Sequence, residues 1–138
     1  MRRIEPTHVW IGHAGDGRDF RALFDRDIRA VVQLALEEPP IVAPRELIVL
    51  RFPLVDGEGN EEWLLRLAVD AVSRLISIEI PTLVCCGAGM SRAPAIVATA
   101  LANVQQSSAA ACLASVTARS PADVSPVLWQ ELTSAMRR

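Results

Sequence analysis

The sequence predicts a single α/β domain, in which a central, mostly parallel sheet of four to five strands is flanked by helices. Signals for strands and for helices alternate along the 138 residues, a pattern typical of parallel sheets whose strands are joined by helices. The chain is long enough to bury one core and too short for two sizeable domains. We therefore expect residues 1–138 to form one domain with helices on both faces of the sheet.

The clearest local patterns place individual elements within this scheme. Residues 16–26 and 61–78 carry apolar side chains at helical spacing, and the apolar runs at residues 47–52 and 82–84 predict buried strands. The helix expected after Arg92 is apolar nearly all round. A helix without a polar face belongs at the centre of a domain, so we expect this one to be buried on all sides.

Several other side chains are predicted to pack in the core. We expect Trp63 and Trp129 to anchor helices, and Cys112, which lies among alanines on a helix face, to be buried. The amphipathic pattern of residues 61–78 predicts one apolar stripe. That stripe consists of Leu64, Leu67, Ala68, Ala71, Val72, Leu75 and Ile76.

The composition excludes several classes of function. With 51% hydrophobic residues, a formal net charge of −2 and no basic arm, the chain has the profile of an ordinary soluble globule, and we expect neither a nucleic-acid partner nor a membrane partner. Its three cysteines are an odd number and have no metal-ligand spacing, so we expect a reducing cytoplasm, no disulfide framework and no metal. The first residues lack the apolar core of a signal peptide.

The strongest functional signal is a cysteine, Cys86, followed by five residues and an arginine, between the strand at residues 82–84 and a helix that Pro94 opens. Free N–H groups and the positive end of a helix dipole favour a bound dianion at such a junction, and also the thiolate form of Cys86. An arginine can direct two N–H donors to two phosphate oxygens. The segment therefore predicts a nucleophile in a phosphate-binding loop, whose binding residues are Gly87, Ala88, Gly89, Met90, Ser91 and Arg92.

Individual residues of this loop have more specific predicted roles. Gly87 and Gly89 permit the unusual backbone angles that would curl the N–H donors inward. Ser91 is expected either to shape the loop or to donate a hydrogen bond to the thiolate. Cys85 is expected to be a packed residue at the strand end, because a disulfide between neighbouring cysteines is strained.

In this motif and in the segments around it, the chain resembles the cysteine-dependent protein tyrosine phosphatase superfamily, and in particular its small dual-specificity branch. The resemblance extends over nearly the whole chain. It implies strands at residues 9–12 and 28–34, and a closing pair of helices around residues 119–126 and Leu128. It also implies that phosphotyrosine, phosphoserine or phosphothreonine is hydrolysed, without a cofactor, through a phosphocysteine intermediate on Cys86.

The resemblance assigns a general acid and base to Asp56. The segment Pro53-Leu54-Val55-Asp56 resembles the acidic loop of the family, and Asp56 precedes Cys86 by thirty residues, a separation similar to that between general acid and nucleophile. Asp56 also opens a run of turn-forming residues. Its roles as a turn residue and as a general acid are compatible, because a general acid has to lie on a loop that reaches the leaving group. Glu58 is the nearest residue that could take the general-acid role in place of Asp56.

Two departures from the family pattern leave other functions open. The family usually has histidine at the position of Cys85 and serine or threonine at that of Ala93, so the thiolate is less favoured and the phosphocysteine breaks down more slowly. These changes fit a phosphate-binding pseudophosphatase. The Arg-Ala-Pro variant found in some plant glucan phosphatases keeps a glucan, lipid or nucleotide substrate open. The acidic loop disfavours a sulfurtransferase or an arsenate reductase.

The acidic pair Glu37 and Glu38 bears on substrate charge. If this pair lies near the mouth of the site, it disfavours highly acidic substrates by like-charge repulsion.

Overall fold

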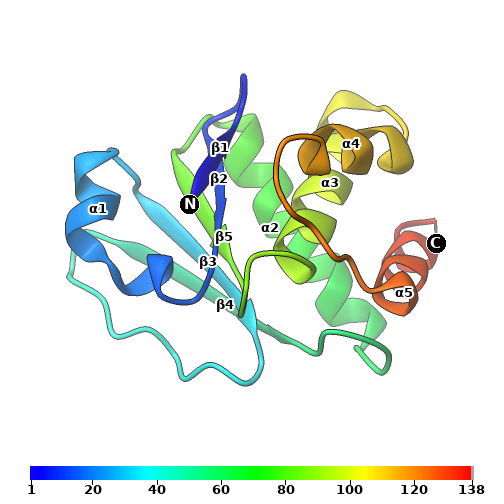
Figure 1. The fold of residues 1–138 in the computed structure, drawn as a ribbon, viewed down its shortest axis with the longest axis horizontal. Coiled ribbons are helices and arrows are strands. Elements are labelled where there is room, and N and C mark those ends of the chain that lie inside the picture. The colour runs from blue at the N-terminus through cyan, green and yellow to red at the C-terminus, as the bar shows by residue number, and fades with distance from the viewer. Residues whose placement is uncertain (138) are drawn as a thin grey trace.

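A computed structural model, which describes residues 1–137, confirms the predicted α/β fold with a mostly parallel sheet (Figure 1). The five strands lie in the order β1-β2-β5-β3-β4, and only the β1–β2 pair is antiparallel. The strands are β1 (Arg2–Ile4), β2 (Val9–Gly12), β3 (Ala30–Ala35), β4 (Ile48–Leu54) and β5 (Thr82–Cys85). The three-residue strand β1 was not predicted.

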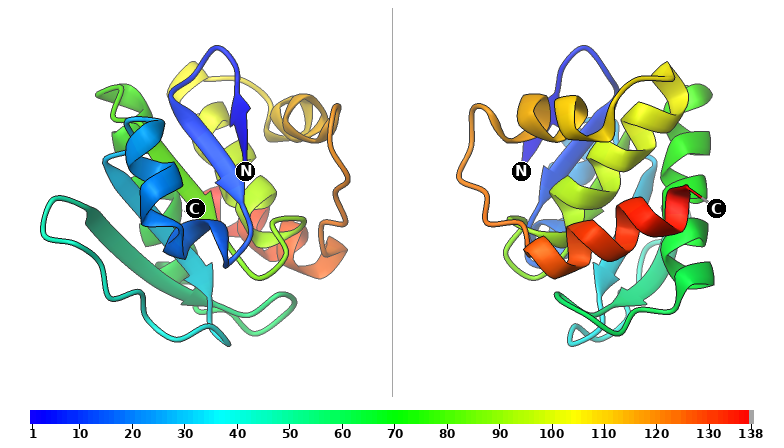
Figure 2. Two further views of the ribbon diagram at one scale, coloured as in Figure 1. Left: turned by 60° about the vertical axis from the view of Figure 1, so that its left-hand side comes forward. Right: turned by 90° about the vertical axis from the view of Figure 1, so that its right-hand side faces the viewer.

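Helices cover both faces of the sheet, as predicted (Figures 1 and 2). A short 3-10 helix, η1, and helix α1 lie on one face, and the remaining helices pack together on the other, where most of the core lies. The helices are η1 (Asp16–Arg18), α1 (Phe20–Asp25), α2 (Glu62–Ser77), α3 (Arg92–Gln105), α4 (Ala109–Thr117) and α5 (Pro126–Met136). No helix within the described residues is long and apolar enough to cross a membrane.

The central strand β5 carries the chain into the loop that contains Cys86. Its four residues are all buried, because β2 and β3 pair with it in parallel on either side and helices cover both faces. A strand in this position has to be apolar on both faces, which explains the uninterrupted run that predicted it. The carboxyl ends of β2, β3 and β5 therefore meet at one edge of the sheet, the usual place for a site in an α/β fold.

Helix α3 gives the loop after β5 a rigid support. Its residues from Arg92 to Ala102 are all buried, which confirms the prediction of a central helix. The helix begins at Arg92, two residues before Pro94, where the sequence suggested its start. Proline is tolerated there because backbone N–H groups in the first turn have no partner within the helix.

Three details of the helix predictions were wrong. The buried face of α2 is centred on Leu65, Val69 and Val72, whereas Leu67, placed on the predicted stripe, is 49% exposed. Trp63 is 63% exposed and belongs to neither core cluster, although Trp129 does pack against the core. The helix predicted at residues 16–26 is divided at Asp19, whose carboxylate accepts a hydrogen bond from the backbone N–H of Ala22 and caps α1.

Candidate active site

The two adjacent cysteines at the end of β5 face opposite sides of the sheet. Cys86 is buried among the side chains of the main core beside α3, and Cys85 is buried in the smaller cluster beneath α1. Burial, reinforced by the nearby Cys86, raises the pKa of the Cys85 thiol to about 12. A β-carbon on Gly17 would lie 2.9 Å from the Cys85 sulfur, so the packing there is tight. Cys85 is thus the packed strand-end residue that was predicted.

The loop between Cys86 and α3 depends on two glycines for different reasons. Gly89 has a φ of +75°, and a β-carbon on it would lie 2.8 Å from the carbonyl oxygen of Gly12, so no other residue fits without distortion. Gly87 does not share this conformation, and the prediction was wrong for it. Instead, a β-carbon on Gly87 would lie 3.2 Å from both the Arg92 guanidinium and the Glu37 carboxylate, so the position requires a small residue.

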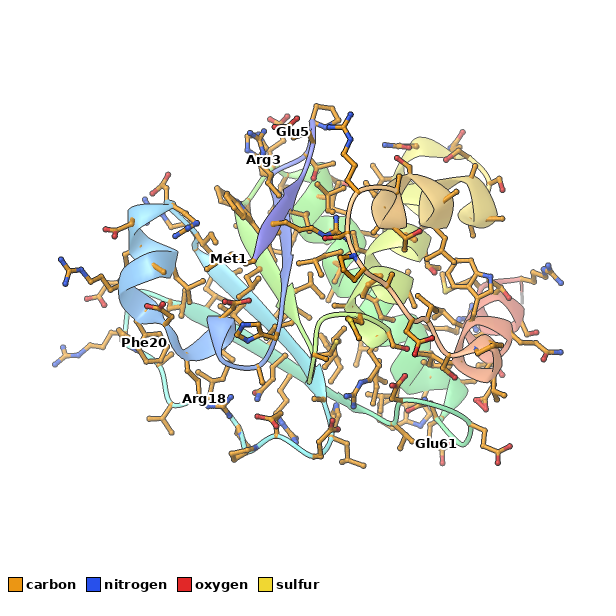
Figure 3. The ribbon with its side chains drawn as sticks, in the orientation of Figure 1. Met1, Arg3, Glu5, Arg18, Phe20 and Glu61 are labelled. Carbon is orange, nitrogen blue, oxygen red and sulfur yellow. The ribbon has the colours of Figure 1, made fainter. Side chains whose placement is uncertain are left out.

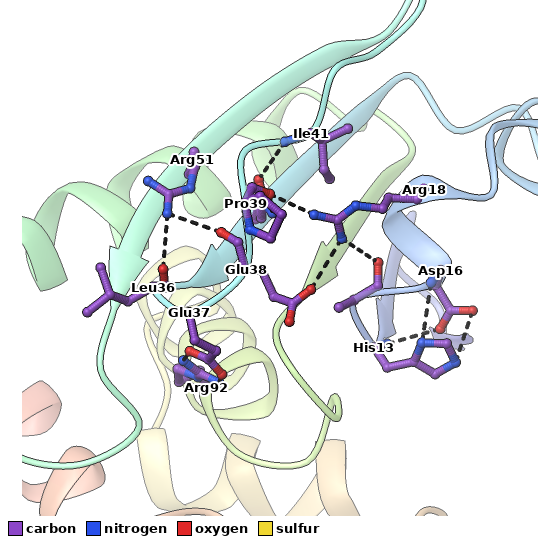
Figure 4. Close-up of polar contacts among 12 residues, drawn as sticks. His13, Asp16, Arg18, Leu36, Glu37, Glu38, Pro39, Ile41, Arg51 and Arg92 are labelled. Atoms are coloured by element: carbon purple, nitrogen blue, oxygen red, sulfur yellow. Dashed lines mark hydrogen bonds and ion pairs between the residues drawn. The ribbon is translucent and has the colours of Figure 1, made fainter.

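Arg92 is held in place by a bidentate ion pair that the sequence did not reveal. Its Nη1 and Nη2 atoms each donate to one carboxylate oxygen of Glu37 at 2.6 Å (Figure 4). Nη1 also donates to the carbonyl oxygen of Leu54 at 2.9 Å. The side chain of Arg92 is only 6% exposed, and its Nε is buried without a hydrogen-bond partner among the described residues. The ion pair raises the pKa of Arg92 and lowers that of Glu37 to about 2.

The loop that carries Glu37 is fixed by arginine side chains from two other elements (Figure 4). Arg51 on β4 donates to the carbonyl oxygens of Leu36 and Glu38. Arg18 in η1 donates to the carbonyl oxygen of Pro39 at 2.6 Å and lies 3.4 Å from the Glu38 carboxylate. The expectation that the acidic pair repels acidic substrates therefore does not hold, because each carboxylate of the pair has an arginine partner.

We expect the replacement Glu37→Gln to destabilise the protein by about 1 kcal/mol near neutral pH, a modest value because the Glu37 carboxylate is half exposed. The pKa of Glu37 is lowered by folding, so the contribution of its charge is complete above the ordinary pKa of 4.5 and is lost as the pH falls towards about 2. Denaturant unfolding at several pH values measures this difference between wild type and variant. A difference in the free energy of unfolding that does not shrink below pH 4.5 would contradict the assigned pair. Glu38→Gln is the matched control, because the ion pair of Glu38 with Arg18 is longer.

Asp56 is tied to the phosphate-binding loop through Ser91. The Ser91 hydroxyl donates to Asp56 Oδ1 at 2.6 Å and accepts the backbone N–H of Ser125 at 2.9 Å. Of the two predicted roles of Ser91, this geometry favours the shaping of the loop. The Asn60 carboxamide closes the turn after β4 through two hydrogen bonds to the backbone of Val55.

The predicted catalytic residues line one cavity of about 100 Å³ at the carboxyl edge of the sheet. Its walls comprise Asp56, Cys86, Ala88, Met90, Ser91, Arg92 and Asp123. Glu58, the predicted substitute for Asp56, is not among them. Asp123 was not predicted, and it is held there by a hydrogen bond of 2.9 Å from its backbone N–H to the carbonyl oxygen of Met90. A cavity of about 420 Å³ between α3, α4 and α5 has neither cysteine nor carboxylate among its described lining residues.

The fold, with a cysteine at the end of the central strand and an arginine at the start of the following helix, defines a small dual-specificity phosphatase domain. A family model described as "Polymorphic toxin system, DSP-PTPase phosphatase" matches residues 10–106, and the chain belongs to this family. None of the curated proteins matches this chain in sequence.

Solved structures of dual-specificity phosphatases share the fold at low sequence identity. Human DUSP28 is 22% identical, with a TM-score of 0.85 over 99% of this chain and 96% of that one. A mouse putative dual specificity phosphatase complexed with zinc tungstate is 23% identical, with a TM-score of 0.83 over 98% and 85%. The human tyrosine phosphatase-like serine/threonine/tyrosine-interacting protein is 16% identical, with a TM-score of 0.80 over 99% and 95%.

Proposed function

We propose that residues 1–138 form a catalytic domain that hydrolyses phosphomonoesters through a phosphocysteine intermediate on Cys86. The observation that carries this proposal is the single small cavity that Cys86, Arg92 and Asp56 line together. Cys86 and Arg92 flank one loop, whereas Asp56 comes from a distant part of the chain after β4. Structural packing alone gives no reason for a thiol, a guanidinium and a carboxylate to line the same cavity. Phosphotyrosine, phosphoserine and phosphothreonine are the proposed substrates.

In the first chemical step, Cys86 Sγ attacks phosphorus, the bond from phosphorus to the leaving oxygen breaks, and the Asp56 carboxylic acid gives its proton to that oxygen. Because Oδ1 of Asp56 accepts the Ser91 hydroxyl, Oδ2 is the oxygen that carries the proton. In the second step, the Asp56 carboxylate takes a proton from water, the water oxygen attacks phosphorus, and the S–P bond breaks. Free thiolate and inorganic phosphate result.

Phosphate binding falls to Arg92 and to the backbone of residues 87–91. The Nε of Arg92 is buried without a partner among the described residues, and a phosphate oxygen in the cavity would supply one. Donors that are already fixed when charge develops on the phosphoryl oxygens stabilise the transition state without further reorganisation. The Glu37 pair provides this fixation for Arg92.

The direct test is pre-steady-state hydrolysis of an aryl phosphate by the wild type in the presence of a chelator. We expect a burst of about one equivalent of aryl alcohol followed by slower steady turnover, because Ala93 lacks the hydroxyl that assists breakdown of the intermediate. Asp56→Asn is expected to slow the release of a poor leaving group by about 10²-fold, because the variant has no proton to give to the leaving oxygen. Equal rates for wild type and Asp56→Asn would contradict the role of Asp56.

The second candidate is a pseudophosphatase that binds phosphate and turns it over negligibly. Cys85 and Ala93 favour it, since both replace residues that support catalysis in most of the family, and one protein of the same fold is described as tyrosine phosphatase-like. Absence of both burst and turnover, with phosphate or tungstate still bound, would establish this candidate in place of the enzyme.

The family description places such phosphatases in polymorphic toxin systems, and we propose that this chain serves one by removing phosphate from molecules of a target cell. Expression of the wild type inside test cells is expected to inhibit growth, and expression of Cys86→Ser is not. Equal growth with both forms, at equal protein levels, would contradict a toxic activity that depends on Cys86.

A further inference from the structure

A groove beside the phosphate-binding loop has a lining of a different charge from that of the catalytic cavity. This groove, of about 360 Å³, is called the Arg2 groove here, and it shares Ala88 and Met90 with the catalytic cavity. The catalytic cavity is small, so the part of a substrate beyond the phosphate lies outside it, and a substrate that passes the shared walls enters the Arg2 groove. The remaining walls of the Arg2 groove include Arg2, Gly12, His13, Asp16, Ser120 and Pro121.

Arg2 supplies this groove with a positive charge that no carboxylate neutralises. Its Nη2 donates to the carbonyl oxygen of Val116 at 2.8 Å, and no carboxylate of residues 1–137 lies within 4.0 Å of its guanidinium. The side chain is partly buried, and this desolvation lowers the pKa of Arg2. A partly desolvated cation attracts anions more strongly than one in bulk water.

The acidic residue of the groove, Asp16, is already engaged by other groups. Its Oδ2 lies 3.3 Å from the amino group of Met1 and accepts the backbone N–H of His13 at 3.0 Å, and its Oδ1 lies 3.5 Å from the imidazole Nε2 of His13. In the Arg2 groove, the positive charge of Arg2 is therefore available to a ligand, whereas the negative charge of Asp16 is already offset by neighbouring groups. The catalytic cavity, in contrast, has two acidic residues, Asp56 and Asp123, in its lining.

We propose that the Arg2 groove is a second anion subsite, which binds a second phosphate group of a substrate whose scissile phosphate lies against Cys86. This inference rests on the proposed function, and it narrows the substrate to molecules with two phosphate groups. The second group adds affinity because its binding is intramolecular once the first phosphate is in place. Either a small bisphosphate or a doubly phosphorylated peptide presents this chemistry.

Binding to the Cys86→Ser variant tests the subsite without any need for turnover. The probes are α,ω-alkanediol bisphosphates of increasing length and doubly phosphorylated peptides of increasing spacing, each with its monophosphate. We expect an optimum length at which the second phosphate improves affinity by about 10-fold or more, a gain that disappears in a Cys86→Ser/Arg2→Met double variant. The better of the two probe series identifies the source of the second phosphate. The absence of any gain, or a gain that Arg2→Met leaves intact, would overturn the proposal.

Arg3 is the matched control, because it is the next residue on the same strand and its side chain is exposed outside the groove. It donates to the carbonyl oxygen of Thr7 at 2.7 Å, and Figure 3 places it towards the β1–β2 turn, away from Met1. Arg3→Met is expected to retain the gain. If Arg2→Met fails to fold, Ser120→Asp puts a carboxylate into the same groove and is expected to abolish the gain.

Turnover by the wild type separates this inference from the proposed function. If neither a monophosphate nor a bisphosphate is hydrolysed, the proposed function fails, and the binding experiment alone still decides for or against the subsite. If both are hydrolysed, kcat/KM for the bisphosphate is expected to fall by about 10-fold in Arg2→Met, with kcat/KM for the monophosphate unchanged. Equal losses for both substrates would overturn the subsite and leave the phosphatase intact.

Discussion

Replacing Cys86 with serine is expected to lower the turnover of aryl phosphates by about 10⁴-fold or more, the largest effect of any single substitution in this protein. A serine hydroxyl is not ionised near neutral pH, and Asp56 does not remove its proton, because Asp56 acts in the first step as the protonated general acid. Phosphate affinity should remain, because Arg92 and the loop backbone are unchanged. Steady-state kinetics together with equilibrium phosphate binding measure the two effects separately.

Cys112→Ser is the matched control for this substitution. Cys112 is buried in α4 far along the chain, and its sulfur already lies 3.3 Å from the Ser107 hydroxyl, so a polar replacement is tolerated there. We expect near wild-type turnover from it. If Cys86→Ser retained turnover within about 10-fold of wild type, the phosphocysteine mechanism would be wrong.

Replacing Arg92 with lysine is expected to reduce kcat/KM by about 10³-fold, although the charge is conserved. Three hydrogen bonds of Arg92 depend on the shape of its guanidinium group: two are donated to the Glu37 carboxylate and one to the carbonyl oxygen of Leu54. A lysine ammonium cannot hold these partners and direct a further donor at phosphate, because it is a point charge on a flexible stem. The loss should appear in both phosphate affinity and kcat.

Arg74→Lys, on the exposed end of α2, controls for a general effect of arginine replacement and should leave kcat/KM unchanged. A loss of less than about 10-fold in Arg92→Lys would mean that charge alone suffices, and that the bidentate Glu37 pair has no catalytic purpose. The stability of Arg92→Lys, measured in parallel, shows whether the loss comes from the site or from the fold.

The features that the sequence predicted well depend on residues close together in the chain. A buried run, two glycines, an arginine and an apolar helix indicate the junction at Cys86 without knowledge of the rest of the fold. Asp56 was predicted from the resemblance, and the fold explains its place, because it follows β4 at the edge of the sheet where Cys86 follows β5. The burial of Cys85 could also be predicted, since it lies within a strand that is covered on both faces.

The features that were missed depend on contacts between distant segments. Nothing local distinguishes Glu37 from Glu38. The carboxylate that reaches Arg92 is on a loop whose backbone is held by Arg18 and Arg51, which lie far from it in the sequence. Asp123 reaches the cavity through a backbone hydrogen bond that leaves no sequence signature. The predicted buried face of α2 is rotated slightly about the helix axis from the observed one. A short amphipathic pattern does not define the direction of the buried face closely enough to exclude this error.

Because Cys85 and Cys86 face opposite sides of the sheet, one cysteine per molecule should be open to chemical labelling, and the labelled molecules can be counted. All three cysteines are buried, but among the cavities described only the one at the carboxyl edge of the sheet has a cysteine, Cys86, in its lining. Cys85, with a pKa of about 12, stays a neutral thiol at any pH used for labelling. An alkylating reagent small enough for the cavity should therefore attach once per folded chain, and the stoichiometry of labelling would report the fraction of a preparation that is competent.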